Sequence, residues 1–235
     1  MDVYDALLGA IETDYDITEQ LKETARSSAA VVRHRKSGTR YVLHRYLGSG
    51  TVYRKLLPIR CANLPQIFEV GEKDGHTVVL EEYIQGDTLS YLLSGGLPTE
   101  AETLSILRQL CSALWVIHSL GAVHWDVKPE NIILRGSEVV LIDFDASRVF
   151  QQELESDTQI LGTTGYAAPE QYGLSQSDRR ADIYSLGILL NILCTGQHPV
   201  RTLAPGRLGR VVQKCTMTNP EQRYQTVGQL LEALE

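Results

Sequence analysis

The stretch VHWDVKPEN, residues 123–131, is the part of the sequence around which the rest is organised. It places an acid, a base and an amide (Asp126, Lys128 and Asn131) within six residues. Phosphoryl transfer needs such a set: a carboxylate to orient or deprotonate a hydroxyl, a cation for the phosphate, and an oxygen ligand for Mg²⁺. The pattern therefore favours phosphoryl-transfer chemistry at this loop.

Two later segments strengthen this interpretation. Asp143 lies in LIDFD (141–145), and GTTGYAAPE occupies residues 162–170. In order and spacing the three segments resemble the catalytic loop, the metal-binding loop and the Ala-Pro-Glu segment of protein kinases. The resemblance covers nearly all of residues 17–235 and is closest to short bacterial serine/threonine kinases. It implies an α+β, bilobal protein kinase-like fold, with a small, mainly β N-lobe and a helical C-lobe.

Composition and charge agree with an ordinary soluble protein. The formal net charge of −7 argues against a nucleic-acid or anionic-membrane surface. The four cysteines are far apart in the sequence and are expected to be reduced thiols of a cytoplasmic protein. The first residues are acidic and lack the basic region of a signal peptide, and the apolar run near 188–194 is too short to span a bilayer.

Local patterns divide the chain. We expect residues 1–16 to form a short helix or arm, 17–83 the β-rich N-lobe and 84–235 the helical C-lobe. Two turn signals, 36–39 and 74–75, predict β-hairpins in the N-lobe. Within the N-lobe we expect strands at 17–23, 29–35, 40–45, 67–72 and 77–82, and a short helix at 52–59.

The C-lobe pattern is helical after a linker at residues 83–88. A capping box at Thr99 and Glu102 predicts the start of a long helix that reaches Leu120. On its apolar face, His118 is expected to be a satisfied polar partner. Further helices are expected at 181–193, 208–215 and 227–234.

The resemblance implies a role for each polar residue of the C-lobe motifs. Asp126 would be the catalytic base and Lys128 would contact the transferred phosphate, while Asn131 and Asp143 would hold Mg²⁺ or Mn²⁺ against the phosphates of ATP. Ile133 would lie under the adenine. Structural roles are implied for Asp182, which would brace the catalytic loop, for a Glu170–Arg223 ion pair, for Thr163, and for an apolar stack of His124 and Phe144.

Three features of the C-lobe depart from the family pattern. Trp125 stands where most members carry an arginine that receives an activation-loop phosphate, so a phosphate on Ser156 or Thr158 would lack its usual partner. Asp145 stands where glycine is usual and adopts fewer backbone angles. Between Cys194 and Leu208 the chain is too short for the helix that often docks substrates.

The N-lobe departs further. The position of the glycine-rich loop falls on KETARSSA, residues 22–29, which contains no glycine. Its small polar residues could offer backbone N–H groups to phosphates, or the segment could be a plain hairpin turn. His44 falls on the position of the usual phosphate-binding lysine. From Arg45 to Phe68 there is no acidic residue, and the glutamate that normally pairs with the lysine would fall near Arg54.

A carboxylate elsewhere offers a substitute. Glu82 matches the acid of the hinge, whose following backbone, near Ile84, would bind adenine, and Asp87 or Thr88 would lie near the ribose. Glu81 then falls at the rear of the nucleotide pocket. Strand alternation predicts that Glu81 faces His44 and replaces the missing glutamate. The alternative is a slipped register, with Glu81 in solvent and Glu82 turned inward.

The implied function is an atypical serine/threonine protein kinase, with ATP and Mg²⁺ or Mn²⁺ as cofactors and a protein substrate or binding partner. The alternative from another class is a pseudokinase that acts as a binding or scaffold module. A small-molecule phosphotransferase of kinase fold is the third hypothesis, kept because the substrate-docking region is reduced.

Overall fold

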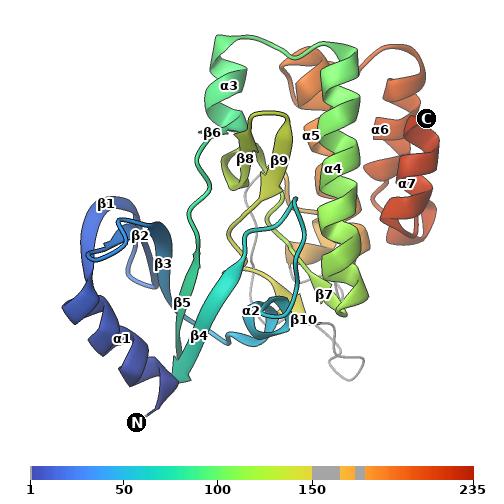
Figure 1. Ribbon diagram of the computed structural model, residues 1–235. Helices are drawn as coiled ribbons and strands as arrows, with labels where there is room; N and C mark the ends of the chain where they lie inside the picture. Colours follow the sequence, from blue (N-terminus) through green and yellow to red (C-terminus); the bar gives the residue numbers. More distant parts are fainter. Residues whose placement is uncertain (1, 150–164, 173–177) are drawn as a thin grey trace. The chain divides into compact units, whose positions relative to one another are not determined.

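The computed structural model describes residues 2–149, 165–172 and 178–235. The chain divides into two compact units, Met1–Gln85 and Gly86–Glu235 (Figure 1). The first contains a five-stranded sheet and the second is largely helical, so the expected α+β class and the expected content of each lobe are confirmed. Within the described ranges no helix combines the length and apolar character needed to cross a membrane.

The sheet of the first unit has the strand order β1-β2-β3-β5-β4, with every neighbouring pair antiparallel. Both predicted hairpin turns form: Gly38 has a φ of 71°, and Asp74 and Gly75 have φ values of 50° and 74°. These left-handed angles suit tight two-strand connections. The strands are β1 (Tyr15–Glu23), β2 (Ser27–His34), β3 (Arg40–Leu47), β4 (Ile67–Lys73) and β5 (His76–Glu82).

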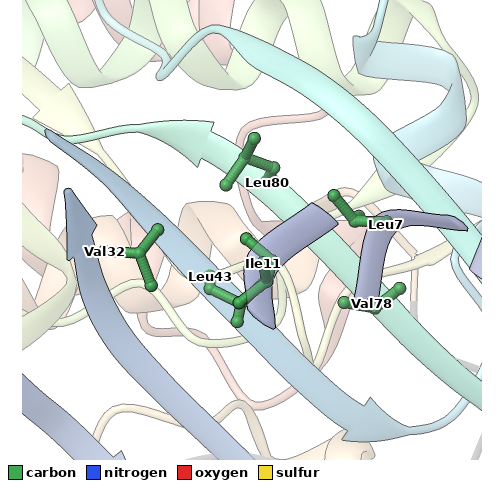
Figure 2. Close-up of a cluster of buried hydrophobic side chains, with 6 residues drawn as sticks. All are labelled: Leu7, Ile11, Val32, Leu43, Val78 and Leu80. Carbon is green, nitrogen blue, oxygen red and sulfur yellow. The ribbon is translucent and has the colours of Figure 1, made fainter. Parts of the chain in front are cut away.

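The N-terminal residues form helix α1 (Val3–Asp14), which packs on one face of this sheet. Its Leu7 and Ile11 are buried against side chains of β2, β3 and β5 (Figure 2): Val32, Leu43, Val78 and Leu80. Burial of each such aliphatic side chain is worth about 1.5–3 kcal/mol. Of the two sequence alternatives, helix or arm, the helix is the one that forms, and it belongs to the first unit.

A glycine permits the close approach of α1. A Cβ added at Gly71 would lie only 2.5 Å from the Cα of Tyr4, so any larger residue in β4 would push the helix away. Lys73, two residues further along β4, forms an ion pair with Asp5 of α1, and the distance between its ammonium nitrogen and the carboxylate oxygen is 2.5 Å. Successive residues of a strand point to opposite faces of the sheet. Leu43 and Leu80 face α1, so the next residues, His44 and Glu81, lie on the opposite face of the sheet.

Helix α2 (Thr51–Leu56) is a short helix in the region where the sequence predicted one. Its Val52, Tyr53 and Leu56 are buried. The carboxylate of Glu72 on β4 accepts hydrogen bonds from the backbone N–H of Gly50 (3.0 Å) and from Arg54 (2.7 Å). The start of α2 is therefore tied to the sheet by a single side chain.

All the helices predicted for the C-lobe form in the second unit. Thr99 and Glu102 form the predicted capping box, with both reciprocal hydrogen bonds present. No helix forms at residues 196–205, as the short spacing predicted. The helices are α3 (Leu89–Gly95), α4 (Glu100–Ser119), α5 (Arg180–Thr195), α6 (Gly206–Cys215) and α7 (Val227–Leu234).

Short strands in this unit were not predicted. The linker expected at residues 83–88 is wrong at its end, because Asp87 and Thr88 form β6 and pair with β8. Strands of two to four residues show no alternating pattern, so sequence periodicity could not find them. They form two small sheets, β6-β8-β9 and β10-β7: β6 (Asp87–Thr88), β7 (Ala122–Val123), β8 (Ile132–Arg135), β9 (Glu138–Leu141) and β10 (Arg148–Val149).

Candidate active site

The residues of the D-x-K-x-x-N pattern form one hydrogen-bonded cluster. The carboxylate Oδ2 of Asp126 lies 2.7 Å from the ammonium of Lys128 and accepts a 2.9 Å hydrogen bond from the side-chain amide of Asn131. The same amide nitrogen donates to the backbone oxygen of Asp126. Asn131 ends a 3₁₀ turn, Pro129–Asn131, that begins at a proline. The cluster holds Asp126 in one orientation.

Asp143 is joined to this cluster through the backbone. The N–H of Ile142 donates to the backbone oxygen of Asn131 at 2.9 Å. This hydrogen bond fixes the backbone immediately before Asp143 to the catalytic loop. Asp143 has a φ of 65°, in the left-handed region that non-glycine residues rarely adopt. Its carboxylate accepts a 3.3 Å hydrogen bond from the N–H of Asp145. Asp145 itself has no positive φ, so its aspartate is compatible with this backbone.

Asp182, the first acid of α5, braces the loop as the resemblance implied. Its two oxygens accept hydrogen bonds from the backbone N–H groups of His124 (2.9 Å) and Trp125 (2.8 Å). His118 of α4 contacts the same carboxylate at 2.8 Å. Burial alone would raise the pKa of Asp182, but the contacts with His118 and His124 outweigh it and hold the pKa below its usual value.

The predicted stack of His124 and Phe144 is present. Their ring centroids are 5.2 Å apart in an edge-to-face arrangement, and both side chains are buried. His124 also lies 3.2 Å from the backbone oxygen of Ile142. The imidazole therefore joins the catalytic loop to the residue before Asp143.

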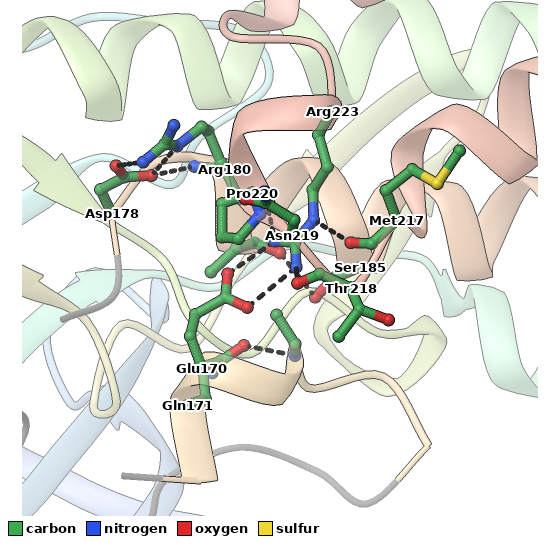
Figure 3. Close-up of polar contacts among 12 residues, drawn as sticks. Glu170, Gln171, Asp178, Arg180, Ser185, Met217, Thr218, Asn219, Pro220 and Arg223 are labelled. Carbon is green, nitrogen blue, oxygen red and sulfur yellow. Dashed lines mark hydrogen bonds and ion pairs between the residues drawn. The ribbon is translucent and has the colours of Figure 1, made fainter. Parts of the chain in front are cut away.

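The Glu170–Arg223 pair is also as expected. Arg223 donates to both carboxylate oxygens of Glu170, at 2.6 and 2.9 Å, and to the backbone oxygen of Met217 at 2.7 Å (Figure 3). Both side chains are buried. A bidentate contact between arginine and a carboxylate is geometrically specific. This one fixes the Pro169–Tyr172 turn to the segment before α7.

Comparison with known proteins decides the family. The family model for the protein kinase domain matches residues 52–233. The chain belongs to the protein kinase family.

Bacterial kinases are among its curated relatives. Over 140 residues it is 38% identical to the serine/threonine-protein kinase PknL of Mycobacterium tuberculosis, covering 58% of this chain and 35% of that protein. Over 200 residues it is 30% identical to a probable serine/threonine-protein kinase of Clostridium perfringens, covering 74% and 29% respectively. For the serine/threonine-protein kinase pkn2 of Myxococcus xanthus the identity is 32% over 142 residues, which is 57% of this chain and 17% of that protein.

The chain therefore spans between 17% and 35% of the length of these relatives. The family match begins at residue 52, so β1 to β3, and with them His44, lie outside it. This is the part of the kinase chain in which the sequence departs most from the family pattern.

The predicted contact between His44 and Glu81 is present. Nε2 of His44 on β3 lies 2.9 Å from Oε1 of Glu81 on β5, and the residues are 5% and 2% exposed. The ring of Tyr53 from α2 lies 6.1 Å from the imidazole. Because Glu81 is buried, the slipped-register alternative is wrong.

Arg54, at the position expected for the usual glutamate, pairs with Glu72 on β4. Helix α2 thus places an aromatic ring, not an acid, beside His44. In this kinase chain the carboxylate that contacts the β3 residue comes from the sheet itself.

The segment at the position of the glycine-rich loop is a compact hairpin turn. The hydroxyl of Thr24 accepts hydrogen bonds from the N–H groups of Arg26 (3.3 Å) and Ser27 (2.9 Å). The N–H of Thr24 donates to the backbone oxygen of Ser27 at 2.8 Å. These three N–H groups are used within the turn, which favours the plain-hairpin interpretation over a phosphate cradle.

The other predicted nucleotide-binding residues fall in both units. In the first, Glu82 accepts a 3.1 Å hydrogen bond from the N–H of Gln66, and Ile84 is 4% exposed. In the second, Ile133 of β8 pairs with Thr88 of β6, and the neighbouring Asp87 is exposed. The hydroxyl of Thr88 caps α3 by accepting from the N–H of Tyr91, which leaves Asp87 as the stronger candidate for a ribose contact.

Some candidates lie outside the described residues: Ser156, Thr158 and Thr163. The expectation that His118 has a polar partner is confirmed, but sequence reasoning did not identify that partner as Asp182, the acid that holds the catalytic loop. Gln171 was not singled out, yet its amide donates to the backbone oxygen of Trp125 at 2.9 Å. Neither role has a local sequence signal, because each depends on which residues the fold brings together.

Proposed function

We propose that this chain is a serine/threonine protein kinase that transfers the γ-phosphoryl group of Mg·ATP to a protein hydroxyl, with a histidine–glutamate pair in place of the usual lysine–glutamate pair. The observation that carries the proposal is the cluster of Asp126, Lys128 and Asn131. Similarity to serine/threonine kinases supports it.

The cluster is suited to phosphoryl transfer. Contacts with Lys128 and Asn131 orient the carboxylate of Asp126, which prepares it to accept a proton from the attacking hydroxyl. Lys128 provides a positive charge beside the base, where a transferred phosphoryl group would need one. Since such catalysis consists mostly of positioning and electrostatics, a rigid hydrogen-bonded set is the relevant feature.

The donor set fits a divalent cation. The side-chain nitrogen of Asn131 donates to Asp126, which leaves the amide oxygen Oδ1 as the atom of this side chain that can serve as a metal ligand. Asp143 would supply carboxylate oxygens. Mg²⁺ prefers oxygen ligands and is usually held by one or two protein groups together with phosphates and water. When bound, such an ion would neutralise charge on the phosphates.

His44 is proposed to contact the nucleotide phosphates, with Glu81 holding its ring. A buried carboxylate without a partner would be costly, so the contact between Glu81 and His44 holds both side chains in place. The arrangement supplies one hydrogen-bond donor where lysine would supply three, which favours weaker ATP binding than in a kinase with lysine at this position.

The decisive experiment is radiolabelled phosphate transfer from ATP, to the protein itself and to a generic protein acceptor. Asp126→Asn is the matched control, because it preserves size and removes the carboxylate. We expect measurable transfer by the parent and a loss of about 100-fold to 10,000-fold in the variant, the usual contribution of a positioned general base. Equal signals from parent and variant would reject the proposal.

A pseudokinase that acts as a binding module is the second candidate. It is favoured by the hairpin turn at Thr24–Ser27, whose N–H groups are already engaged. Absence of transfer together with ATP-induced stabilisation would select it. Transfer to a small-molecule hydroxyl but not to protein would select the phosphotransferase hypothesis.

Metal-dependent nucleotide binding is tested separately. The protein kinase hypothesis and the phosphotransferase hypothesis both predict a rise in Tm with ATP plus Mg²⁺ or Mn²⁺, because a ligand that binds only the folded state stabilises it. Asp143→Asn should reduce the metal-dependent part of that rise.

The net charge of −7 supports a protein partner over a nucleic acid or an anionic membrane, and four free cysteines support a cytoplasmic location.

A further inference from the structure

Trp125 occupies the position at which most protein kinases carry an arginine, and its side chain is buried. The indole is 4% exposed and packs in a cluster with Val123, Ala168 and Ala181. Among the described residues its Nε1 has no hydrogen-bond partner. The ring therefore acts as an apolar group that contacts the turn after Tyr166.

Both backbone groups of Trp125 are also bound. Its N–H donates to Asp182 at 2.8 Å, and its oxygen accepts from the side-chain amide of Gln171 at 2.9 Å. The other end of that amide, Oε1 of Gln171, accepts from the N–H of Ala168 at 2.8 Å. One glutamine, 1% exposed, thus bridges the catalytic loop and the 166–171 turn.

These contacts hold a strained residue. Trp125 has a φ of 67°, an angle that bulky residues adopt rarely. Such a conformation persists only where the surroundings over-determine it, and it is concentrated at functional sites. Because Trp125 directly precedes Asp126, its backbone conformation sets the position of the carboxylate.

We propose that Trp125 and Gln171 form a clamp that positions Asp126 by docking the 166–171 turn on the catalytic loop, in place of an arginine–phosphate contact. Both are positioning residues, and the inference rests on the proposed kinase function. The far side of the turn is held independently, by Ser185 on the oxygen of Tyr166 (2.9 Å) and by Arg223 on Glu170. The clamp joins the turn to the catalytic loop itself.

The test uses Gln171→Glu, which keeps the acceptor for Ala168 and removes the donor to Trp125. Gln222→Glu is the matched control, because it introduces the same charge at an exposed position in the same unit. Both are made in a Trp115→Phe background. The protein has two tryptophans, and Trp115 is 62% exposed, so Trp125 becomes the single reporter.

The first measurement is acrylamide quenching of Trp125 emission as a function of pH. The parent should show a protected, blue-shifted indole. Gln171→Glu should show increased quenching at neutral pH and recover protection as the pH falls, because burial raises the pKa of a carboxyl group and its protonated form can donate to the Trp125 oxygen. The parent carries the same titratable neighbours, with Asp182 on the Trp125 N–H, His118 on Asp182 and Arg148 6.0 Å from the indole, so its pH profile records their contribution.

The second measurement is kinetic. Gln171→Glu should lower kcat by about 100-fold, the effect of a misplacement near 1 Å, while KM for ATP stays unchanged because the nucleotide-binding residues are untouched. Gln222→Glu should match the parent in both measurements.

The proposal is overturned if the parent indole is freely quenched, or if Gln171→Glu behaves like Gln222→Glu at every pH. It is also overturned if Gln171→Glu exposes Trp125 without lowering kcat. If no variant transfers phosphate but the emission changes follow the expected pH pattern, the clamp is supported and the proposed kinase function is what fails.

Discussion

His44 and Glu81 form a buried contact across a diagonal of the sheet. In the β3–β5 register, His44 lies opposite Val79 and Glu81 lies opposite Val42, yet the imidazole Nε2 and the carboxylate Oε1 are 2.9 Å apart. Diagonal neighbours on one face of an antiparallel pair are within reach of long side chains. Both members of the pair therefore belong to the same sheet, with neither on a helix.

The first prediction concerns the stability of this pair. Removing one member, as in His44→Leu, leaves a buried carboxylate without its partner and should lower the free energy of unfolding by about 3–5 kcal/mol. The double variant His44→Leu/Glu81→Leu should recover much of that loss, because both polar groups are gone. Urea denaturation of the single and double variants measures this. A double variant as unstable as the sum of the singles would contradict an energetic coupling.

The second prediction concerns the charge at position 44. Histidine gains its positive charge as the pH falls, so the parent should bind ATP more tightly in mildly acidic buffer. His44→Lys should bind ATP more tightly than the parent at neutral pH and lose most of the pH dependence, since lysine stays charged. Calorimetric titration with Mg·ATP provides the measurement. Identical, pH-independent affinities would remove His44 from the phosphate site.

The third prediction separates the pair from helix α2. Arg54→Ala breaks the salt bridge to Glu72. The side chains of Arg54 and Glu72 are 46% and 29% exposed, so this salt bridge contributes at most about 1 kcal/mol to stability. Because the carboxylate beside His44 comes from β5, ATP affinity should not change. Glu81→Gln, at the same sheet face as His44, should weaken ATP binding. A loss of affinity in Arg54→Ala as large as in Glu81→Gln would show that α2 controls the site.

The fourth prediction concerns Asp182. Burial opposes its ionisation, but its contacts with His118 and His124 prevail and lower its pKa in the folded state. A lowered pKa stabilises the fold above the pKa of unfolded aspartate, near 3.9, and this contribution is lost as the pH falls through the folded value. Asp182→Asn should therefore be less stable than the parent at neutral pH.

The difference between parent and Asp182→Asn should shrink in acid, when the parent carboxylate is protonated as well. Unfolding in urea between neutral pH and about pH 3 tests the sign. A difference that stays constant over this range would contradict a contribution from the charge.

The fifth prediction concerns phosphorylation. With the apolar ring of Trp125 at the usual arginine position, any kinase activity should survive phosphatase treatment of the purified protein. Intact mass before and after treatment shows whether phosphate was present and removed. Abolished activity after verified removal would mean that another cation, such as Arg148, receives a phosphate.

Much of the fold follows from local sequence signals. The Thr99–Glu102 capping box, the Asp74-Gly75 turn and the order of the catalytic motifs all act between residues close in the chain, so the sequence alone predicted them correctly. The same is true of the short connection between α5 and α6. Strand alternation was enough to predict that Glu81 faces His44, once the hinge position of Glu82 was assigned.

The tertiary structure decided the rest, because the remaining contacts join residues far apart in the chain. In the turn after β1, only the folded structure showed that the N–H groups of Arg26 and Ser27 donate to the Thr24 hydroxyl and are not left for a phosphate. Likewise, only the packing of α1 against Gly71 showed that this helix belongs to the sheet unit. The bridge from Gln171 to Trp125 spans 46 positions. No local pattern encodes such a pair, since it forms only when two packed segments bring a donor and an acceptor within hydrogen-bond distance.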